Sequence, residues 1–317
     1  MIIKLDQAVE LIKSGDVVAF PTETVYGLGA DAFNIQAIKK TFELKGRPSD
    51  NPLIVHVSNQ QQVDSVAEQL PEEFEKLKQA FWPGPLTMIL PKSDRVPDLV
   101  TGGLNTVAVR MPDHPIALKL IRQTGPLTAP SANKSGKPSP TKPEHLDQDY
   151  KEGIPILDGG SSEIGLESTI LDLTISPPEI LRPGAITAHQ IENVTGSTVT
   201  DFRNRSLSDT EPVKSPGLKY THYKPAATVK WMKRIPATLN QHTIYIVHSK
   251  KNWPDHPQIF SYKKNYARLA RDLYDVFRTA DHLGYSDIEI EQLPDAESDR
   301  MIHALLNRIT KAVGTDE

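Results

Sequence analysis

Short apolar runs alternate with helically patterned stretches over the first two hundred residues. Residues 17–20 form an apolar run that stops at Pro21, which predicts a short buried strand. Apolar residues then recur at helical spacing over 35–42, which predicts a helix that ends near Gly46 in the left-handed conformation. The segment between them, residues 20–32, is interpreted as a polar, glycine-bearing loop that joins the strand to the helix.

The same two patterns predict the other elements of this region. We expect helices over 4–14, 72–80 and 115–123, and strands over 53–57, 86–90, 106–111, 127–130, 154–158, 168–173 and 179–181. Helices and strands that alternate in this way indicate an α/β fold. Residues 1–200 are therefore predicted to form one α/β domain.

The pattern stops after this region and then resumes. Residues 201–228 are polar and show no periodicity, which is typical of a linker. Beyond them, we expect strands over 227–232, 243–247 and 287–290 and helices over 265–281 and 298–313. This alternation predicts a second, small domain over residues 229–317, with a parallel sheet and helices on its faces.

Composition excludes several classes of protein. The chain has 317 residues, no cysteine and a net charge of −4, which argues against disulfides, cysteine–zinc sites and a generally basic nucleic-acid binder. No run approaches the roughly 18 apolar residues of a membrane span, and the N-terminus lacks a signal-peptide pattern. We therefore expect a cytoplasmic protein without membrane association. The sequence contains neither a Walker loop nor a G-x-G-x-x-G motif.

Candidate chemistry gathers at predicted strand ends and in the adjoining loops. If residues 45–47 are extended, Lys45 and Arg47 project to one side and could hold a triphosphate; the alternative is a solvated helix end. Two further cations and six neutral groups occupy similar positions: Arg110, Arg182, Thr24, Thr106, Ser131, Asn133, Ser139 and Ser168. Such a set suits an anionic ligand with many oxygens, such as a nucleotide together with a small acid.

Seven segments in this order resemble one known family. They are PTETVYGLG, KGRPSDNPLIVHV, WPGPLT, TVAVRMPDH, APSANKSG, LESTILD and LRPG. They are similar to the threonylcarbamoyl-AMP synthases, whose catalytic part is the YrdC-like domain. SPGLKYTHYKP and the domain after it resemble the long, two-domain form. The resemblance implies a twisted, mixed sheet with helices over 1–200, a linker or lid over 201–228 and a small Rossmann-like domain over 229–317.

The resemblance also implies a reaction and its residues. L-threonine, bicarbonate and ATP would give threonylcarbamoyl-AMP and pyrophosphate, and a partner complex would transfer the group to tRNA. Mg²⁺ is expected to accompany ATP, although no acidic pair indicates its protein ligands. Lys45, Arg47, Ser131 and Asn133 would be catalytic; Thr24, His56, Arg110 and Ser168 would hold threonine; Arg47, Asn51, Thr106, Ser131, Ser139, Arg182 and Tyr223 would hold ATP.

Alternative functions remain open at this point. One is a module that binds double-stranded RNA or tRNA without catalysis, although acidic residues outnumber basic ones over 1–228. Another is an enzyme that forms a different carbamoyl-adenylate. The segment 215–225 is interpreted as a lid that brings Tyr223 to the nucleotide and excludes water, with a passive spacer as the alternative.

Overall fold

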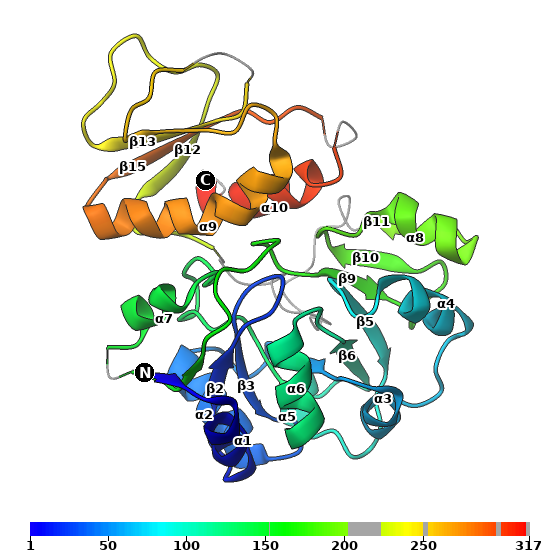
Figure 1. Cartoon of the computed structure of the whole chain (residues 1–317). Coiled ribbons are helices and arrows are strands. Elements are labelled where there is room, and N and C mark those ends of the chain that lie inside the picture. The colour runs from blue at the N-terminus through cyan, green and yellow to red at the C-terminus, as the bar shows by residue number, and fades with distance from the viewer. Residues whose placement is uncertain (152, 202–222, 250–252, 296–298, 315–317) are drawn as a thin grey trace.

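The computed structural model describes residues 1–151, 153–201, 223–249, 253–295 and 299–314 (Figure 1). The first domain is built on one sheet of eleven strands. Its strands are β1 (Ile2–Ile3), β2 (Val18–Phe20), β3 (Gly27–Asp31), β4 (Ile54–His56), β5 (Leu86–Pro91), β6 (Thr106–Arg110), β7 (Leu127–Thr128), β8 (Ile156–Leu157), β9 (Thr169–Asp172), β10 (Glu179–Arg182) and β11 (Thr200–Asp201). Their order is β1-β8-β2-β3-β7-β4-β6-β5-β9-β10-β11, with parallel and antiparallel pairs, so the prediction of a mixed sheet is confirmed.

Helices cover this sheet and provide its core. They are α1 (Leu5–Lys13), α2 (Ile35–Lys45), α3 (Gln60–Val66), α4 (Glu72–Phe81), α5 (Asp98–Thr101), α6 (Pro115–Thr124), α7 (Pro143–Asp149) and α8 (Ala188–Thr195). Ile12 of α1 and Leu120 of α6 pack with Phe20 of β2, whereas Phe74 of α4 packs in the cluster that contains Val55 of β4. Sequence patterning did not predict α3, α5, α7 or α8, which are all short.

The predicted strand-to-helix loop over 20–32 is wrong in its second half. Residues 27–31 form β3, which pairs antiparallel with β2. A Cβ on Gly29 would lie 2.9 Å from the Phe20 ring, so this glycine allows close strand packing rather than a loose loop. Only residues 21–26 form the turn, and the chain therefore makes a hairpin before it enters α2.

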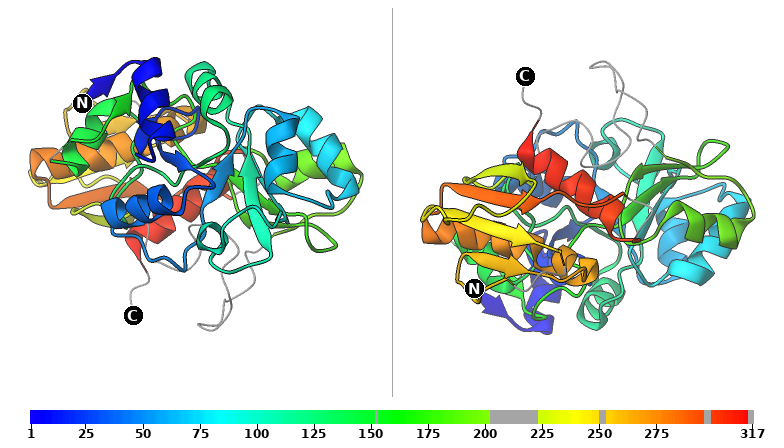
Figure 2. Two further views of the ribbon diagram at one scale, coloured as in Figure 1. Left: turned by 90° about the horizontal axis from the view of Figure 1, so that it is seen from below. Right: turned by 90° about the horizontal axis from the view of Figure 1, so that it is seen from above.

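The C-terminal domain contains a parallel sheet, as predicted, but within the described residues it has a fourth strand, over 259–261, that the sequence analysis did not expect. Its strands β12 (Thr228–Met232), β13 (Thr243–Val247), β14 (Ile259–Ser261) and β15 (Asp287–Glu291) are arranged in the order β12-β15-β13-β14. Within the described residues, α9 (Tyr266–Leu283) and α10 (Ile302–Val313) both pack on the face that carries Ile244, Ile246 and Ile288, rather than on opposite faces as expected. Both helices lie between this sheet and the first domain (Figures 1 and 2).

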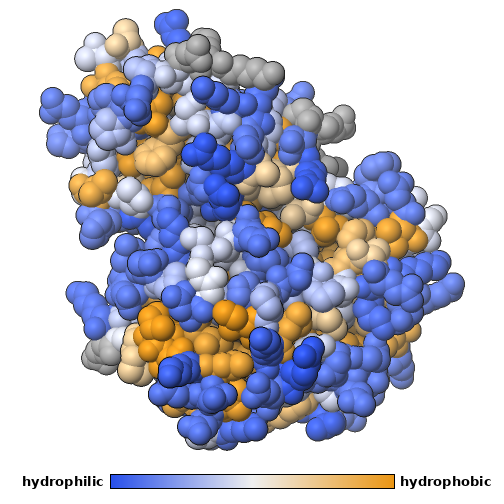
Figure 3. Space-filling view, viewed as in Figure 1, coloured by the Kyte–Doolittle hydropathy of each residue, from blue (hydrophilic) through white to orange (hydrophobic). Residues whose placement is uncertain are grey.

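The two domains are in close contact through α9 and α10. Gly165, with φ +78°, lies so near α9 that a Cβ would fall 2.4 Å from the Arg271 Cα. Lys142, the N-cap residue of α7, and His145 of α7 both contact the Asp275 carboxylate of α9. A polar cleft adjoins these residues, and the molecular surface is indented between the domains (Figure 3). The structure therefore fixes the C-terminal domain against the wall of the first domain.

Candidate active site

A cavity in the first domain brings most of the predicted site residues together. Its wall is formed by segments far apart in the sequence: the turn before β3, the ends of β4 and β6, the loop after β7 and the residues that precede β9. The predicted residues that line it are Thr24, Arg47, His56, Arg110, Ser131, Asn133, Ser168, Arg182 and Tyr223. Loops that were separate in the sequence thus form one polar site.

Backbone hydrogen bonds fix the turn before β3 against the loop after β7. The Leu28 N–H donates to the Pro130 carbonyl and the Ala132 N–H donates to the Tyr26 carbonyl, both at 2.8 Å. Within the turn, the Thr22 hydroxyl donates to the Val25 carbonyl at 2.6 Å. These contacts pre-organise the cavity wall, as a binding site requires.

His56 and Arg110 define one end of the cavity. They are paired in the parallel β4–β6 register. The Arg110 guanidinium donates to the Thr24 hydroxyl at 2.8 Å and to the Gly84 carbonyl at 3.1 Å. Its Nη2 also lies 2.6 Å from the buried carboxylate of Glu23. The sequence interpretation assigned no role to Glu23. A counter-ion could have been expected, because a buried arginine at a strand end needs one.

Burial sets the charge state of His56. It lowers the pKa of His56 to about 3, and the nearby Arg110 charge contributes in the same direction. The imidazole is therefore neutral at physiological pH, and its Nδ1 has no hydrogen-bond partner among the described residues. A neutral ring beside an arginine suits a ligand that combines a carboxylate with a hydroxyl.

Lys45 and Arg47 are not side by side on an extended segment, so this part of the prediction is wrong. Lys45 ends α2, and Gly46 takes the left-handed conformation with φ 60°. Buried Lys45 donates its Nζ to the Ser131 and Asn133 carbonyls, and burial, together with the Arg47 charge, lowers its pKa well below the usual value. Lys45 therefore supports the loop at 131–133 from behind, whereas Arg47 lines the cavity.

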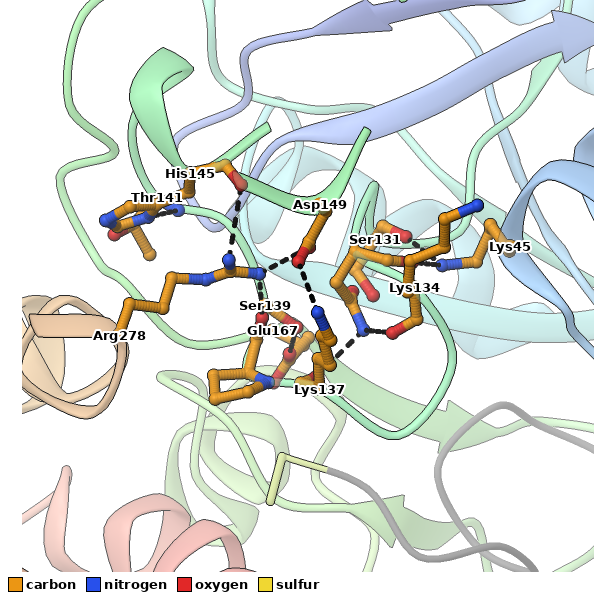
Figure 4. Close-up of polar contacts among 12 residues, drawn as sticks. Lys45, Ser131, Lys134, Lys137, Ser139, Thr141, His145, Asp149, Glu167 and Arg278 are labelled. Carbon is orange, nitrogen blue, oxygen red and sulfur yellow. Dashed lines mark hydrogen bonds and ion pairs between the residues drawn. The ribbon is translucent and has the colours of Figure 1, made fainter. Parts of the chain in front are cut away.

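The loop over 131–139 is held from both sides (Figure 4). The Asn133 amide donates to the Lys134 and Lys137 carbonyls at 2.8 and 2.9 Å. Arg278 of α9 reaches the Pro138 carbonyl, and it pairs with the buried Asp149 carboxylate at 2.7 Å. The C-terminal domain thus fixes the far end of this loop.

Ser168 and Arg182 contact each other in another part of the cavity wall. The buried Arg182 guanidinium donates to the Ser168 carbonyl and hydroxyl, each at 3.1 Å, and the Thr87 hydroxyl lies 2.7 Å from the Ser168 hydroxyl. Glu167 also lines the cavity and accepts a hydrogen bond from Ser139. Sequence patterning did not identify Glu167, although it stands inside the LESTILD segment.

Tyr223 places the described end of the linker at the cavity. Residues 202–222 lie outside the described part, so the predicted lid over 215–225 is seen only from Tyr223 onward. The Tyr223 ring stacks on Tyr274 of α9 with 5.5 Å between centroids. Burial raises the pKa of Tyr223, so its hydroxyl remains a hydrogen-bond donor at neutral pH.

Four predicted residues do not line the cavity: Lys45, Asn51, Thr106 and Ser139. Ser139 contacts Glu167 behind the wall, and the Asn51 carbonyl accepts from Arg47 at 3.2 Å. Thr106 begins β6, four residues from Arg110, which corresponds to roughly 13 Å along the strand. Because Ile54 is paired with Ala108, Thr106 and Asn51 lie at the same end of the sheet, away from Arg110.

Several buried polar atoms of the site have no hydrogen-bond partner among the described residues. They include Asn133 Oδ1 and His56 Nδ1, whose residues line the cavity. Buried polar atoms are normally paired because leaving them unpaired costs free energy, so these atoms are suited to a ligand. In the described part of the chain, no group of three acidic or histidine side chains could hold a metal ion. The acidic groups Glu23 and Glu167 are each paired with an arginine instead.

Comparisons with known proteins agree with this geometry. The family described as "Telomere recombination" (Sua5, YciO and YrdC) matches residues 10–184, and the threonylcarbamoyl-AMP synthase C-terminal domain matches residues 186–314. A Pyrococcus abyssi threonylcarbamoyl-AMP synthase is 42% identical and covers 98% of this chain and 94% of its own length. The chain belongs to the threonylcarbamoyl-AMP synthase family. The prediction of the long, two-domain form is therefore confirmed.

Two further relatives support the assignment. A Bacillus subtilis threonylcarbamoyl-AMP synthase is 45% identical, with 98% of this chain and 93% of the relative covered. The crystal structure of P. abyssi Sua5 complexed with L-threonine superimposes with a TM-score of 0.86 at 39% identity, covering 99% of this chain and 97% of that chain.

Among the described residues, no helix has the length and apolarity needed to cross a membrane.

Proposed function

We propose that this chain forms threonylcarbamoyl-AMP and pyrophosphate from L-threonine, bicarbonate and ATP. The observation that carries this proposal is the single cavity lined by Arg47, Arg110 and Arg182 together with several hydroxyl groups. Three cations beside neutral donors suit a carboxylate at one end and phosphates at the other. The family assignment supplies the identity of the three substrates.

Threonine fits the end of the cavity at His56 and Arg110. Arg110 would receive the threonine carboxylate, because its guanidinium is already oriented by Thr24, Gly84 and Glu23. The neutral His56 imidazole and the Ser168 hydroxyl provide polar contacts without adding charge. P. abyssi Sua5, which has the same fold, was crystallised in complex with L-threonine, which supports threonine as a ligand of this fold.

The chemistry requires positioning and charge stabilisation more than a strong base. Threonine and bicarbonate condense to a carbamate, and a carbamate oxygen then attacks the α-phosphorus of ATP. The new O–P bond forms as the bond to the bridging oxygen breaks, and pyrophosphate leaves. Arg47 and Arg182 would stabilise the charge that develops on the phosphates. Lys45 would contribute indirectly, because it fixes the Ser131 and Asn133 backbone.

In this proposal, Mg²⁺ would bind together with the ATP phosphates. The described residues do not form a carboxylate cage, since Glu23 and Glu167 already pair with arginines. We further propose that the reaction takes place in the cytoplasm and that a separate complex transfers the threonylcarbamoyl group to tRNA.

The decisive experiment measures pyrophosphate release from ATP. Release should require both threonine and bicarbonate and should fall to background when either is omitted. Release that continues without threonine would contradict the proposal. Carbamoyl phosphate, offered instead of threonine and bicarbonate, tests for a different carbamoyl-adenylate.

The alternative of an RNA-binding module without catalysis is less compatible with the site. Two of the three arginines that line the cavity are buried: Arg110 and Arg182 are each 4% exposed, whereas Arg47 is half-buried. Phosphate backbones are usually contacted by exposed basic side chains, so buried arginines favour a small ligand. Salt-sensitive binding of double-stranded RNA without ATP turnover would support the alternative instead.

A further inference from the structure

Arg308 is a fully buried arginine that belongs to the C-terminal domain but bonds mainly to the first domain. Its side chain is 0% exposed. Its Nε donates to Glu167 Oε2 at 2.9 Å, its Nη1 donates to the Pro183 carbonyl at 2.9 Å, and its Nη2 donates to the Glu167 carbonyl at 3.4 Å. Burying a guanidinium costs free energy unless its donors are satisfied, so this placement is specific.

Glu167 connects Arg308 to the cavity. Its Oε1 accepts from the Ser139 hydroxyl, and its Oε2 accepts from the Tyr274 hydroxyl of α9 at 3.1 Å. Burial alone would raise the pKa of this carboxyl, but the charges of Arg308 and Arg182 outweigh that effect and lower it. The Glu167 carboxylate is therefore an ionised acceptor that orders three side chains from different parts of the chain.

The same two helices enclose Tyr223. Its ring stacks on Tyr274, and the Arg308 guanidinium lies 5.4 Å from its centroid. Tyr223 has φ +67°, a conformation that costs free energy for a residue other than glycine. Contacts from α9 and α10 thus hold a strained residue that lines the cavity.

We propose that Arg308 is a positioning residue for the nucleotide end of the site. Through Glu167 it orients Ser139, and through its contact with Tyr223 it fixes the aromatic wall beside Arg182. The C-terminal domain is accordingly part of the ATP-binding machinery. This inference rests on the proposed function, because it assigns ATP to that end of the cavity.

The test compares Arg308→Met with Arg308→Lys and with the unaltered protein. Arg308→Met should raise the KM for ATP at least tenfold and leave the KM for threonine within twofold. Arg308→Lys, which keeps the charge but loses the planar fork, should give an intermediate value. Arg268→Met, at an exposed arginine of α9, is the matched control and should change neither constant.

A second variant separates positioning from simple loss of folding. Arg308→Met leaves Glu167 as an unpaired buried charge, so adding Glu167→Gln should restore at least part of the folded fraction and of the affinity for ATP. An equal loss for both substrates, or no change in the KM for ATP, would overturn the proposal. So would the absence of any recovery in the double variant.

Calorimetric titration measures the binding of ATP alone, whereas the test of the proposed function measures pyrophosphate release. The titration needs no turnover, so it reports on Arg308 even if pyrophosphate release proves independent of threonine. Weaker ATP binding by Arg308→Met than by Arg268→Met supports the positioning role. Equal binding by these two variants overturns it.

Discussion

The two ends of the cavity are supported in different ways. At the end proposed to hold threonine, Arg110 is oriented by Thr24, Gly84 and Glu23, which all belong to the first domain. At the end proposed to hold the nucleotide, Glu167 and Tyr223 are held by side chains from α9 and α10. One half of the site is therefore complete within the first domain, and the other half depends on the C-terminal domain.

This difference shows how a second domain can support a site that lies in another domain. Doubly wound domains usually bind ligands at the carboxyl ends of their parallel strands. Here the C-terminal domain instead turns one face of α9 and α10 toward the first domain (Figure 1), and Arg278 and Arg308 extend from those helices. If the two ends are independent, a substitution at one end should change the kinetic constants for one substrate more than those for the other.

The largest effect is expected from Arg278→Met. Removing this guanidinium leaves the buried Asp149 carboxylate, among the described residues, with the more distant Lys137 as its ion-pair partner, so the free energy of unfolding should fall by about 3–5 kcal/mol. Urea denaturation measures the change. Arg278→Met with Asp149→Asn should recover part of it, and no difference between the single and double variants would contradict the role of the pair.

Arg47→Ala is expected to lower kcat/KM for ATP. The corresponding loss of transition-state stabilisation should be about 2–4 kcal/mol, the range for loss of one pre-organised donor. The physical reason is that Arg47 lines the cavity and its guanidinium is fixed by the Asn51 and Pro52 carbonyls. Pyrophosphate release at varied ATP measures the effect. Arg122→Ala, at an exposed position on α6, should behave as the unaltered protein.

Arg110→Lys should act on the threonine end instead. Lysine keeps the charge opposite Glu23 but loses the fork that reaches Thr24 and Gly84. We expect the KM for threonine to rise about tenfold, or about 1.4 kcal/mol, with the KM for ATP within twofold. Equal changes in both constants would show that the two ends are not independent.

The smallest effect concerns acid stability at His56. Its pKa is about 3 in the folded protein and near 6.5 when unfolded, so the stability it confers is complete above pH 6.5 and is lost as the pH falls toward 3. When the pH is lowered from 7.5 to 6.0, the free energy of unfolding should fall in both proteins. The fall should be about 0.8 kcal/mol smaller in His56→Gln than in the unaltered protein. Denaturation at both pH values measures this, with exposed His189→Gln as control.

Local patterning was sufficient for much of the fold. The apolar runs at β4, β5 and β6 and the helical spacing of α2 and α9 were predicted from sequence, because each buries a regular face. The hairpin strand β3 was missed, since GLGAD has no alternation and its glycines resemble turn residues. Short helices such as α7 were missed for the same lack of periodicity.

The sequence by itself identified several residues of the cavity wall, such as Arg47, Ser131 and Asn133, because they stand in recognisable segments. Only the tertiary structure decided how they act. Lys45 supports a loop because Gly46 turns the chain after α2, and Arg110 needs Glu23 because both are buried together. The role of Arg308 is a long-range consequence of packing: its partner Glu167 lies 141 residues away, beyond any local pattern.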